Sequence, residues 1–158
     1  MRSGELFDVE RVGSAEELVR AFEGAGTSGT GGRGRFGLWT RNGGAMLTAR
    51  REAFEPFLPP GGQGLRSLDV TLLGVALERL AGVDADAVQA GAVAYSKSAV
   101  DAIAAVRAGD GFDAAFLLEG TPVASISAVA RAGDVMPQKS TYFYPKALSG
   151  LVINPHEW

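Results

Sequence analysis

The chain has 158 residues, a length that favours one domain and is enough to bury a sizeable core. It carries 15 lysines and arginines against 18 aspartates and glutamates, so no basic excess points to nucleic acid. The absence of cysteine excludes disulfides and thiolate chemistry, and the single histidine, His156, excludes a multi-histidine metal site. No apolar run reaches the roughly 20 residues that span a bilayer, and no signal pattern opens the chain. We therefore expect one soluble, cytoplasmic domain over residues 1–158, with no membrane, nucleic-acid or metal partner.

The N-terminal part predicts a strand followed by a capped helix. Glu5 to Val12 places Phe7 and Val9 on one side, as a strand does. Ser14-Ala-Glu-Glu17 is a capping box, in which the Ser14 hydroxyl accepts from the amide of residue 17 and the glutamate reaches back. The helix that follows is expected to end at Gly24.

A glycine-rich segment and a hairpin come next. Gly24 to Gly34 contains six glycines, but no Gly-Lys-Ser/Thr follows them, so a surface loop is favoured over a phosphate-binding loop. Arg35 to Thr40 and Ala45 to Arg50 flank Arg41-Asn-Gly-Gly44. An Asn-Gly pair between two short apolar runs predicts a β-hairpin, because the tight turn needs positive φ.

The second half predicts alternating helices and strands. A helix capped by Ser67 is expected to end at Gly82, and a helix capped by Ser98 is expected to end at Arg107-Ala-Gly-Asp110. Thr121-Pro122 should begin a third helix, as a cap followed by proline at the first helical position. The expected strands are Ala92 to Tyr95, Asp113 to Leu118 and Leu151 to Asn154.

The order of these elements predicts an α+β or α/β fold. We expect a mixed sheet of about six strands with about four helices. The N-terminal half contributes the β-hairpin. The C-terminal half repeats a strand and a helix, each helix ending Arg-Ala-Gly-Asp, which predicts a βαβα unit with partly parallel pairing.

The candidate functional site lies in an irregular segment near the C-terminus. Its lysines and hydroxyls are the groups that hold phosphate or carboxylate by charge-assisted hydrogen bonds, and its tyrosines are able to stack on a base or sugar. The structural alternative, which we favour, is that these groups bond the backbone and fill the core. The candidate anion- or ligand-binding residues are Lys139, Ser140, Thr141, Tyr142, Tyr144 and Lys146.

Two carboxylates are the weak candidates for acid–base chemistry. Asp113 opens an apolar strand and Glu119 follows one, which is where α/β enzymes often place acids. A helix cap or a solvated turn is the commoner role for such residues. His156 alone assembles no serine–histidine–acid arrangement, so no catalytic residue and no cofactor is assigned.

The run Met136-Pro-Gln-Lys-Ser-Thr-Tyr-Phe-Tyr-Pro-Lys146, followed by Ser149-Gly-Leu-Val152, resembles the C-terminal signature of the family called domain of unknown function 1015. The resemblance extends over nearly the whole chain and implies that it corresponds to the C-terminal half of that family. An N-terminal half would then be a partner. The chain departs from the family pattern at Gly74 and at Ser96-Lys97, where the family carries histidines, so no activity is transferred to it.

Two hypotheses for function follow. The first is a non-catalytic ligand-binding or protein-interaction module, with an N-terminal partner half or a second copy of the chain as partner. The second is an enzyme acting on a small anionic metabolite, with Lys139 and Ser140 holding the anion and Asp113 or Glu119 as acid–base. The two are separated by whether these groups converge on one open pocket.

Overall fold

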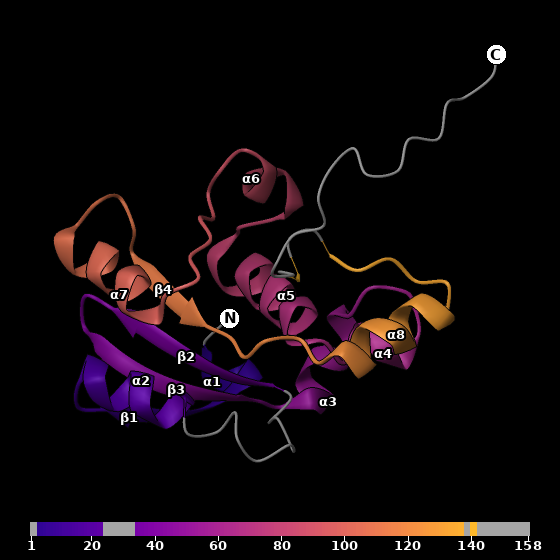
Figure 1. The fold of residues 1–158 in the computed structure, drawn as a ribbon, viewed down its shortest axis with the longest axis horizontal. Helices are drawn as coiled ribbons and strands as arrows, with labels where there is room; N and C mark the ends of the chain where they lie inside the picture. The colour runs from indigo at the N-terminus through magenta and orange to yellow at the C-terminus, as the bar shows by residue number, and fades with distance from the viewer. Residues whose placement is uncertain (1–2, 24–33, 138–139, 142–158) are drawn as a thin grey trace, which may run out of the picture.

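The structure is a computed structural model that describes residues 3–23, 34–137 and 140–141. Within them, four strands form one antiparallel sheet in the order β1-β3-β2-β4 (Figure 1). The strands are β1 (Phe7–Val12), β2 (Arg35–Thr40), β3 (Gly43–Ala49) and β4 (Ala114–Leu117). The helices are α1 (Ser3–Leu6), α2 (Ala15–Glu23), α3 (Arg51–Phe54), α4 (Gln63–Arg66), α5 (Asp69–Ala81), α6 (Ala85–Gln89), α7 (Ala99–Ala108) and α8 (Val123–Arg131), with a 3-10 turn, η2, at Glu55–Phe57.

The predicted hairpin is confirmed as β2 and β3. The strands pair from Arg35 opposite Thr48 to Thr40 opposite Gly43, leaving a two-residue loop. Gly43 has a φ of 116°, a conformation that glycine adopts without the strain a side chain would bring. The Thr40 hydroxyl donates to the Gly43 carbonyl at 3.0 Å and closes the turn.

The prediction of about six strands and about four helices is wrong, although the α+β class fits. The described residues form four strands and eight α-helices, and every strand pair is antiparallel. Ala92 to Tyr95 forms no strand, and Leu151 to Asn154 lies outside the described residues. The expected parallel βαβ pairing is therefore absent from the described part, because β4 pairs with β2 in antiparallel fashion. Four of the helices have only four or five residues, too few for a helical period to show in the sequence.

One face of the sheet carries an aromatic core beneath α1, α3 and α5. The Phe7 ring packs edge-on against Phe36 and Phe54, with centroids 5.7 and 5.3 Å away. Such edge-to-face pairs add to the stabilisation from burial. The buried members of this cluster are Leu6, Phe7, Phe36, Ala45, Leu47, Phe54, Leu72, Val75 and Ala76.

The opposite face of the sheet is covered by α2 and α7. Strand alternation turns Trp39 and Met46 toward these helices, while their neighbours in the strands face the aromatic core. Gly44 makes room for Trp39, since a Cβ at that position would lie 2.7 Å from the indole ring. The buried members here are Ala15, Leu18, Trp39, Met46, Ile103, Val106, Ala115 and Leu117.

The predicted caps of α2 and α7 are confirmed. The Ser14 hydroxyl accepts from the Glu17 amide at 3.1 Å, and the Glu17 carboxylate accepts from the Gly13 amide at 2.7 Å. Ser98 accepts from the Asp101 amide at 3.1 Å. These bonds satisfy amides that a helix start leaves without a partner, and so they fix where both helices begin.

Two predicted caps are wrong. Ser67 does not cap α5, because it lies at the end of α4 and its hydroxyl donates to the Gly64 carbonyl at 3.1 Å. Thr121 does not cap α8, because its hydroxyl donates to the Ser140 carbonyl at 3.2 Å. Both hydroxyls are used to join neighbouring segments instead of capping a helix.

Candidate functional site

The C-terminal segment is described only in part. Ser140 and Thr141 are described, and Ser140 donates its hydroxyl to the Pro137 carbonyl while its own carbonyl accepts from Thr121. These contacts tie the segment to the loop before α8. The remaining predicted site residues lie outside the described residues; they are Lys139, Tyr142, Tyr144 and Lys146.

A small hollow lies beside this contact, between the start of α5 and the loop before α8. Its volume is about 20 Å³, and its lining includes Asp69, Glu119 and Thr121. That space holds about one water molecule and no metabolite. One oxygen of the Glu119 carboxylate, Oε1, is buried with no hydrogen-bond partner among the described residues. Asp69 accepts from the Gly34 amide at 2.6 Å, so it anchors the end of the glycine-rich segment.

The structure does not bring the two predicted acid–base residues together. Asp113 precedes β4 and Glu119 follows it, so they lie at opposite ends of the strand, roughly 20 Å apart at 3.3 Å per residue. The Asp113 side chain is 96% exposed and forms a loose 3.9 Å ion pair with Arg41. It therefore faces solvent rather than a pocket.

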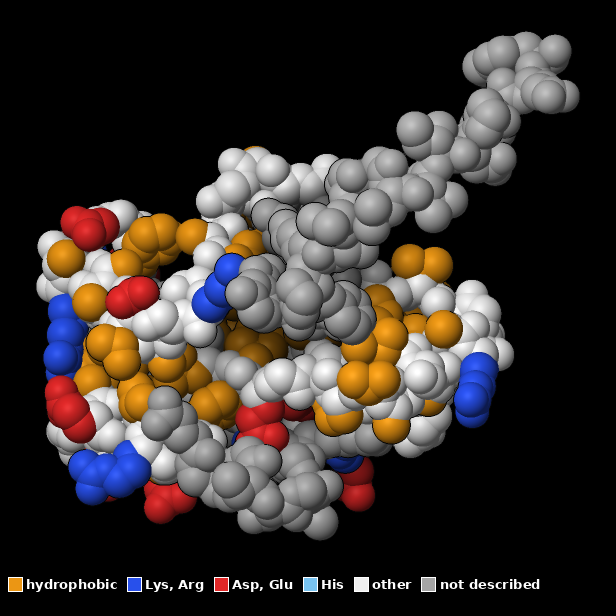
Figure 2. All heavy atoms as spheres, in the orientation of Figure 1, with side chains coloured by type: hydrophobic (Ala, Val, Ile, Leu, Met, Phe, Trp, Pro, Cys, Tyr) orange, Lys and Arg blue, Asp and Glu red, His pale blue; other side chains and the backbone are white. Residues whose placement is uncertain are grey.

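A groove lies between α2 and α7. Its volume is about 410 Å³, and we call it the α2–α7 groove. Figure 2 shows hydrophobic side chains gathered in this region of the surface, bordered by charged ones. The lining residues are Ala15, Glu16, Val19, Arg20, Val100, Ile103, Ala104 and Arg107.

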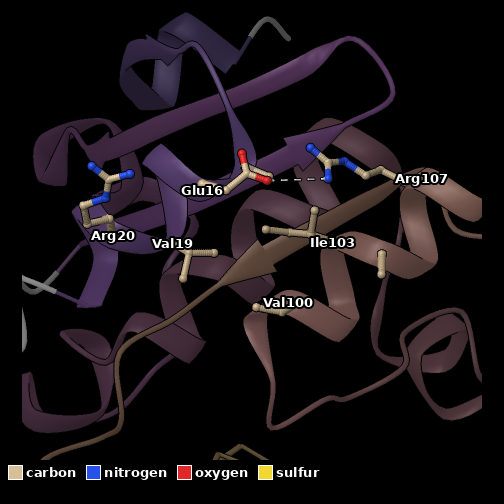
Figure 3. Close-up of a pocket in the computed structure, with 8 residues that line it drawn as sticks. Glu16, Val19, Arg20, Val100, Ile103 and Arg107 are labelled. Carbon is tan, nitrogen blue, oxygen red and sulfur yellow. Dashed lines mark ion pairs between the residues drawn. The ribbon is translucent and has the colours of Figure 1, made fainter.

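Aliphatic side chains form the floor of the groove. Val19 from α2 faces Val100 and Ile103 from α7 (Figure 3). Ile103 is buried in the core beneath, whereas Val100 is 63% exposed. The floor thus offers an apolar surface without a hydroxyl, amide or thiol.

Charged groups form the rim. Arg107 lies 3.9 Å from the Glu16 carboxylate, and Arg20 follows Glu16 by one helical turn on α2. The pKa of Glu16 is lowered by hydrogen bonds to its own backbone amide and to Ser14, and further by the charges of Arg107 and Arg20. Glu16 is therefore ionised at neutral pH. Two guanidinium groups and one carboxylate give the rim a net charge of +1.

Trp39 supports Arg107 from below. The guanidinium carbon of Arg107 lies 5.0 Å from the centre of the indole ring, a cation–π contact. Trp39 is 8% exposed and held in the core, so it fixes one face of the guanidinium. The edges of the guanidinium, which carry its hydrogen-bond donors, remain directed toward the rim.

Sequence reasoning missed this groove. The sequence placed Arg107 only at the end of a helix and singled out no other residue of the groove. The signal was the width of the apolar stripe on α7, which is broader than the sheet beneath it covers. The uncovered apolar side chains of α7 line a groove only because α2, which is distant in the sequence, lies beside α7.

No metal cluster of three or more histidine, cysteine, aspartate or glutamate side chains occurs among the described residues. No described helix is long and apolar enough to cross a membrane. Comparison of the chain with protein-family models, curated proteins and solved structures found no match. The geometry of the groove is therefore the basis for a functional proposal.

Proposed function

We propose that the protein is a non-catalytic binding module that holds a small ligand in the α2–α7 groove. The observation that carries the proposal is the groove itself: about 410 Å³ of space with an aliphatic floor and charged groups at the rim. Ligand sites are usually concave, mostly apolar and furnished with a few polar groups, and they span about 300–1,000 Å³. The α2–α7 groove has each of these properties.

The chemistry of the lining supports binding without catalysis. Among the described residues, the lining contains no serine, threonine, lysine, tyrosine or histidine side chain, so this part offers no nucleophile and no neutral general acid. Glu16 is ionised, more than half exposed and paired with Arg107, which makes it a weak base. Two arginines and an aliphatic floor bind and orient a ligand but do not transform it.

The size of the groove supports a small molecule over a protein partner. A stable protein interface buries about 800 Å² on each partner and involves about 20–30 residues a side. Eight described residues line the groove, too few for a stable protein interface.

The resemblance to domain of unknown function 1015 remains part of the proposal. A module of this kind would act together with an N-terminal partner half or a second copy of the chain.

A ligand panel with a matched pair of variants tests the proposal. Amide chemical shifts of the labelled protein are recorded with nucleotides, phosphates and small carboxylates. Val100→Asp places a charge on the groove floor, and Val123→Asp makes the same change at the 71% exposed start of α8, outside the groove. We expect ligand shifts to cluster on α2 and α7 and to be lost in Val100→Asp alone. The proposal fails if no compound shifts these amides, or if both variants bind equally.

An enzyme acting on a small anionic metabolite is the alternative function. The observation in its favour is the buried Oε1 of Glu119, which has no hydrogen-bond partner among the described residues and lies in the hollow that Thr121 also lines. A carboxylate with an oxygen shielded from water is able to act as a general acid or base when a substrate reaches it. Turnover of a phosphorylated or carboxylated substrate that is lost in Glu119→Gln but kept in Asp113→Asn would support the enzyme and remove the non-catalytic proposal.

A further inference from the structure

The floor of the α2–α7 groove limits the chemistry of the ligand body. Its side chains are those of Ala15, Val19, Val100, Ile103 and Ala104, which carry no polar atoms. A ligand hydroxyl or amide placed against them would lose its bonds to water and gain no replacement. A sugar or nucleotide body is thus disfavoured, and a hydrocarbon body is favoured.

The rim limits the charge of the ligand. Arg20, Arg107 and the ionised Glu16 leave one net positive charge. A carboxylate carries one negative charge and balances it. A phosphate monoester carries about −1.5 to −2 at neutral pH and would place its excess charge against Glu16. The rim therefore matches a monoanion.

Arg107 is prepared to receive a carboxylate. Trp39 holds one face of its guanidinium, which reduces the freedom that binding must remove. The present partner of Arg107, Glu16, lies at 3.9 Å, which is longer than the 2.7–2.9 Å of a charge-assisted hydrogen bond. Both side chains are about half exposed or more, so the pair is weak, and a ligand carboxylate displaces Glu16 at little cost.

Resting on the proposed function of the groove, we propose that its ligand is a small monocarboxylate with a hydrocarbon body. Its carboxylate binds Arg107 in place of Glu16, and its hydrocarbon body lies along Val19, Val100 and Ile103. Arg20, at the α2 side of the rim, adds a second positive charge. Glu16 acts as a selector that keeps out ligands with a second negative charge.

The test uses hexanoate, its neutral counterpart hexanamide and the dianion hexyl phosphate. Amide shifts of the whole chain at neutral pH and low salt give the site and the dissociation constant. We expect hexanoate to bind on α2 and α7 about fivefold to tenfold more tightly than hexanamide, because hydrogen bonds to charged groups are stronger. Hexyl phosphate should bind more weakly than hexanoate. Shortening the acid to butanoate should weaken binding by roughly twofold to fourfold per methylene, since the groove is partly open.

A repeated motif supplies the matched control. Arg107 and Arg131 both stand before Ala-Gly-Asp in the last turn of a helix, but only Arg107 lines the groove. Arg107→Gln should reduce hexanoate affinity to that of hexanamide, whereas Arg131→Gln should leave it unchanged. Glu16→Gln should raise hexanoate affinity by about twofold to fivefold, because it removes the carboxylate that competes for Arg107 in a weak ion pair. It should also reduce the difference in affinity between hexanoate and hexyl phosphate.

The outcomes separate this inference from the proposed function. If hexanamide binds the groove as tightly as hexanoate, or if Arg107→Gln and Arg131→Gln bind alike, the monocarboxylate assignment is overturned. The groove would still be a ligand site in that case. Absence of hexanoate binding at 10 mM also overturns the assignment. The proposed function fails separately, when no compound of the whole panel shifts the amides of α2 and α7.

Discussion

The two faces of the sheet are built differently. On the α1–α3–α5 face, Phe7, Phe36 and Phe54 meet ring to ring, and each is at most 1% exposed. On the α2–α7 face, Trp39 is buried as well, but Val100 of α7 is 63% exposed and lines the groove. The rings of the first face are fully covered, whereas the second face leaves apolar surface exposed. An apolar hollow beside charged groups is typical of a ligand site.

Side-chain size explains the difference. Three helices cover the first face, which is filled by the rings of Phe7 and Phe36 from the strands and Phe54 from α3, whereas two helices cover the second. Where α2 and α7 approach each other, the lining includes the small side chains Ala15 and Ala104. These short side chains do not reach across the surface between the two helices, which is hollow there. The groove is therefore a property of sequence at particular positions rather than of the fold as a whole.

The largest expected loss of stability comes from removing an aromatic ring from the core of the α1–α3–α5 face. Phe36→Ala removes a fully buried ring that packs against Phe7. It should lower the free energy of unfolding by about 3–5 kcal/mol, measured by urea denaturation. Phe112→Ala, at a ring that is 36% exposed, should lose less than half as much. Equal losses of unfolding free energy for both variants would contradict the description of the first face as fully buried.

A smaller loss of stability is expected from adding a side chain at Gly44, beneath Trp39 on the α2–α7 face. The Cβ that Gly44→Ala adds would lie 2.7 Å from both Trp39 and Val12, so the indole must move. We expect a loss of about 1–3 kcal/mol and a displaced indole N–H resonance of Trp39. Gly74→Ala is the control, because Gly74 lies in α5 with nothing within 4 Å of its added Cβ. It should stabilise the protein by about 0.5–1 kcal/mol, and a loss there would argue against the assigned packing.

The same comparison shows what the sequence could predict. The β2–β3 hairpin and the starts of α2 and α7 depend on residues within four positions of one another, so local patterns were sufficient. Strand pairing depends on distant segments, and β4 joins β2 across more than 70 residues. Ala92 to Tyr95 has strand-like composition, but it pairs with none of the four described strands, and composition alone does not show pairing.

The candidate site was harder to predict than the fold. In the sequence, the three rim residues look like ordinary surface residues of a helix; they are Glu16, Arg20 and Arg107. They form one rim only because α2 and α7 lie side by side in the fold. Conversely, Asp113 and Glu119 flank one short strand in the sequence, yet an extended strand holds them apart. The sequence offered Asp113 or Glu119 as alternative acid–base residues, and the strand between them places the two at different ends. The predictions for Lys139, Tyr142, Tyr144 and Lys146 stay open, since these residues lie outside the described part.

The wall of the groove depends on the cap of α7. Ser98→Ala removes the hydroxyl that accepts from the Asp101 amide and should destabilise the protein by about 1 kcal/mol. Ser127→Ala, on the exposed side of α8, removes the same hydroxyl from a helix interior and should change stability little. Hydrogen exchange should report faster opening at the start of α7 in Ser98→Ala. Unchanged exchange there would show that packing on the sheet, rather than the cap, holds the groove wall.

The smallest expected effect concerns the rim and its pH dependence. The pKa of Glu16 in the folded protein is lowered below its ordinary value of 4.5. A lowered pKa means that the folded state favours the ionised carboxylate. The resulting stability is fully present above pH 4.5 and is lost as the pH falls through the folded pKa. Because the group is well exposed, this contribution is small and should weaken further with added salt.

Glu16→Gln isolates this contribution from the other carboxylates that titrate in the same range. The urea midpoints of the wild type and Glu16→Gln should lie farthest apart near pH 7 and converge as the pH falls through the lowered pKa of Glu16. Glu78→Gln, an exposed carboxylate on α5, controls for the loss of one negative charge. If the difference in urea midpoint between the wild type and Glu16→Gln does not change with pH, the folded state does not favour the ionised Glu16 carboxylate. Its pairing with Arg107 would then contribute nothing measurable, and the cost of displacing Glu16 by a ligand would be negligible.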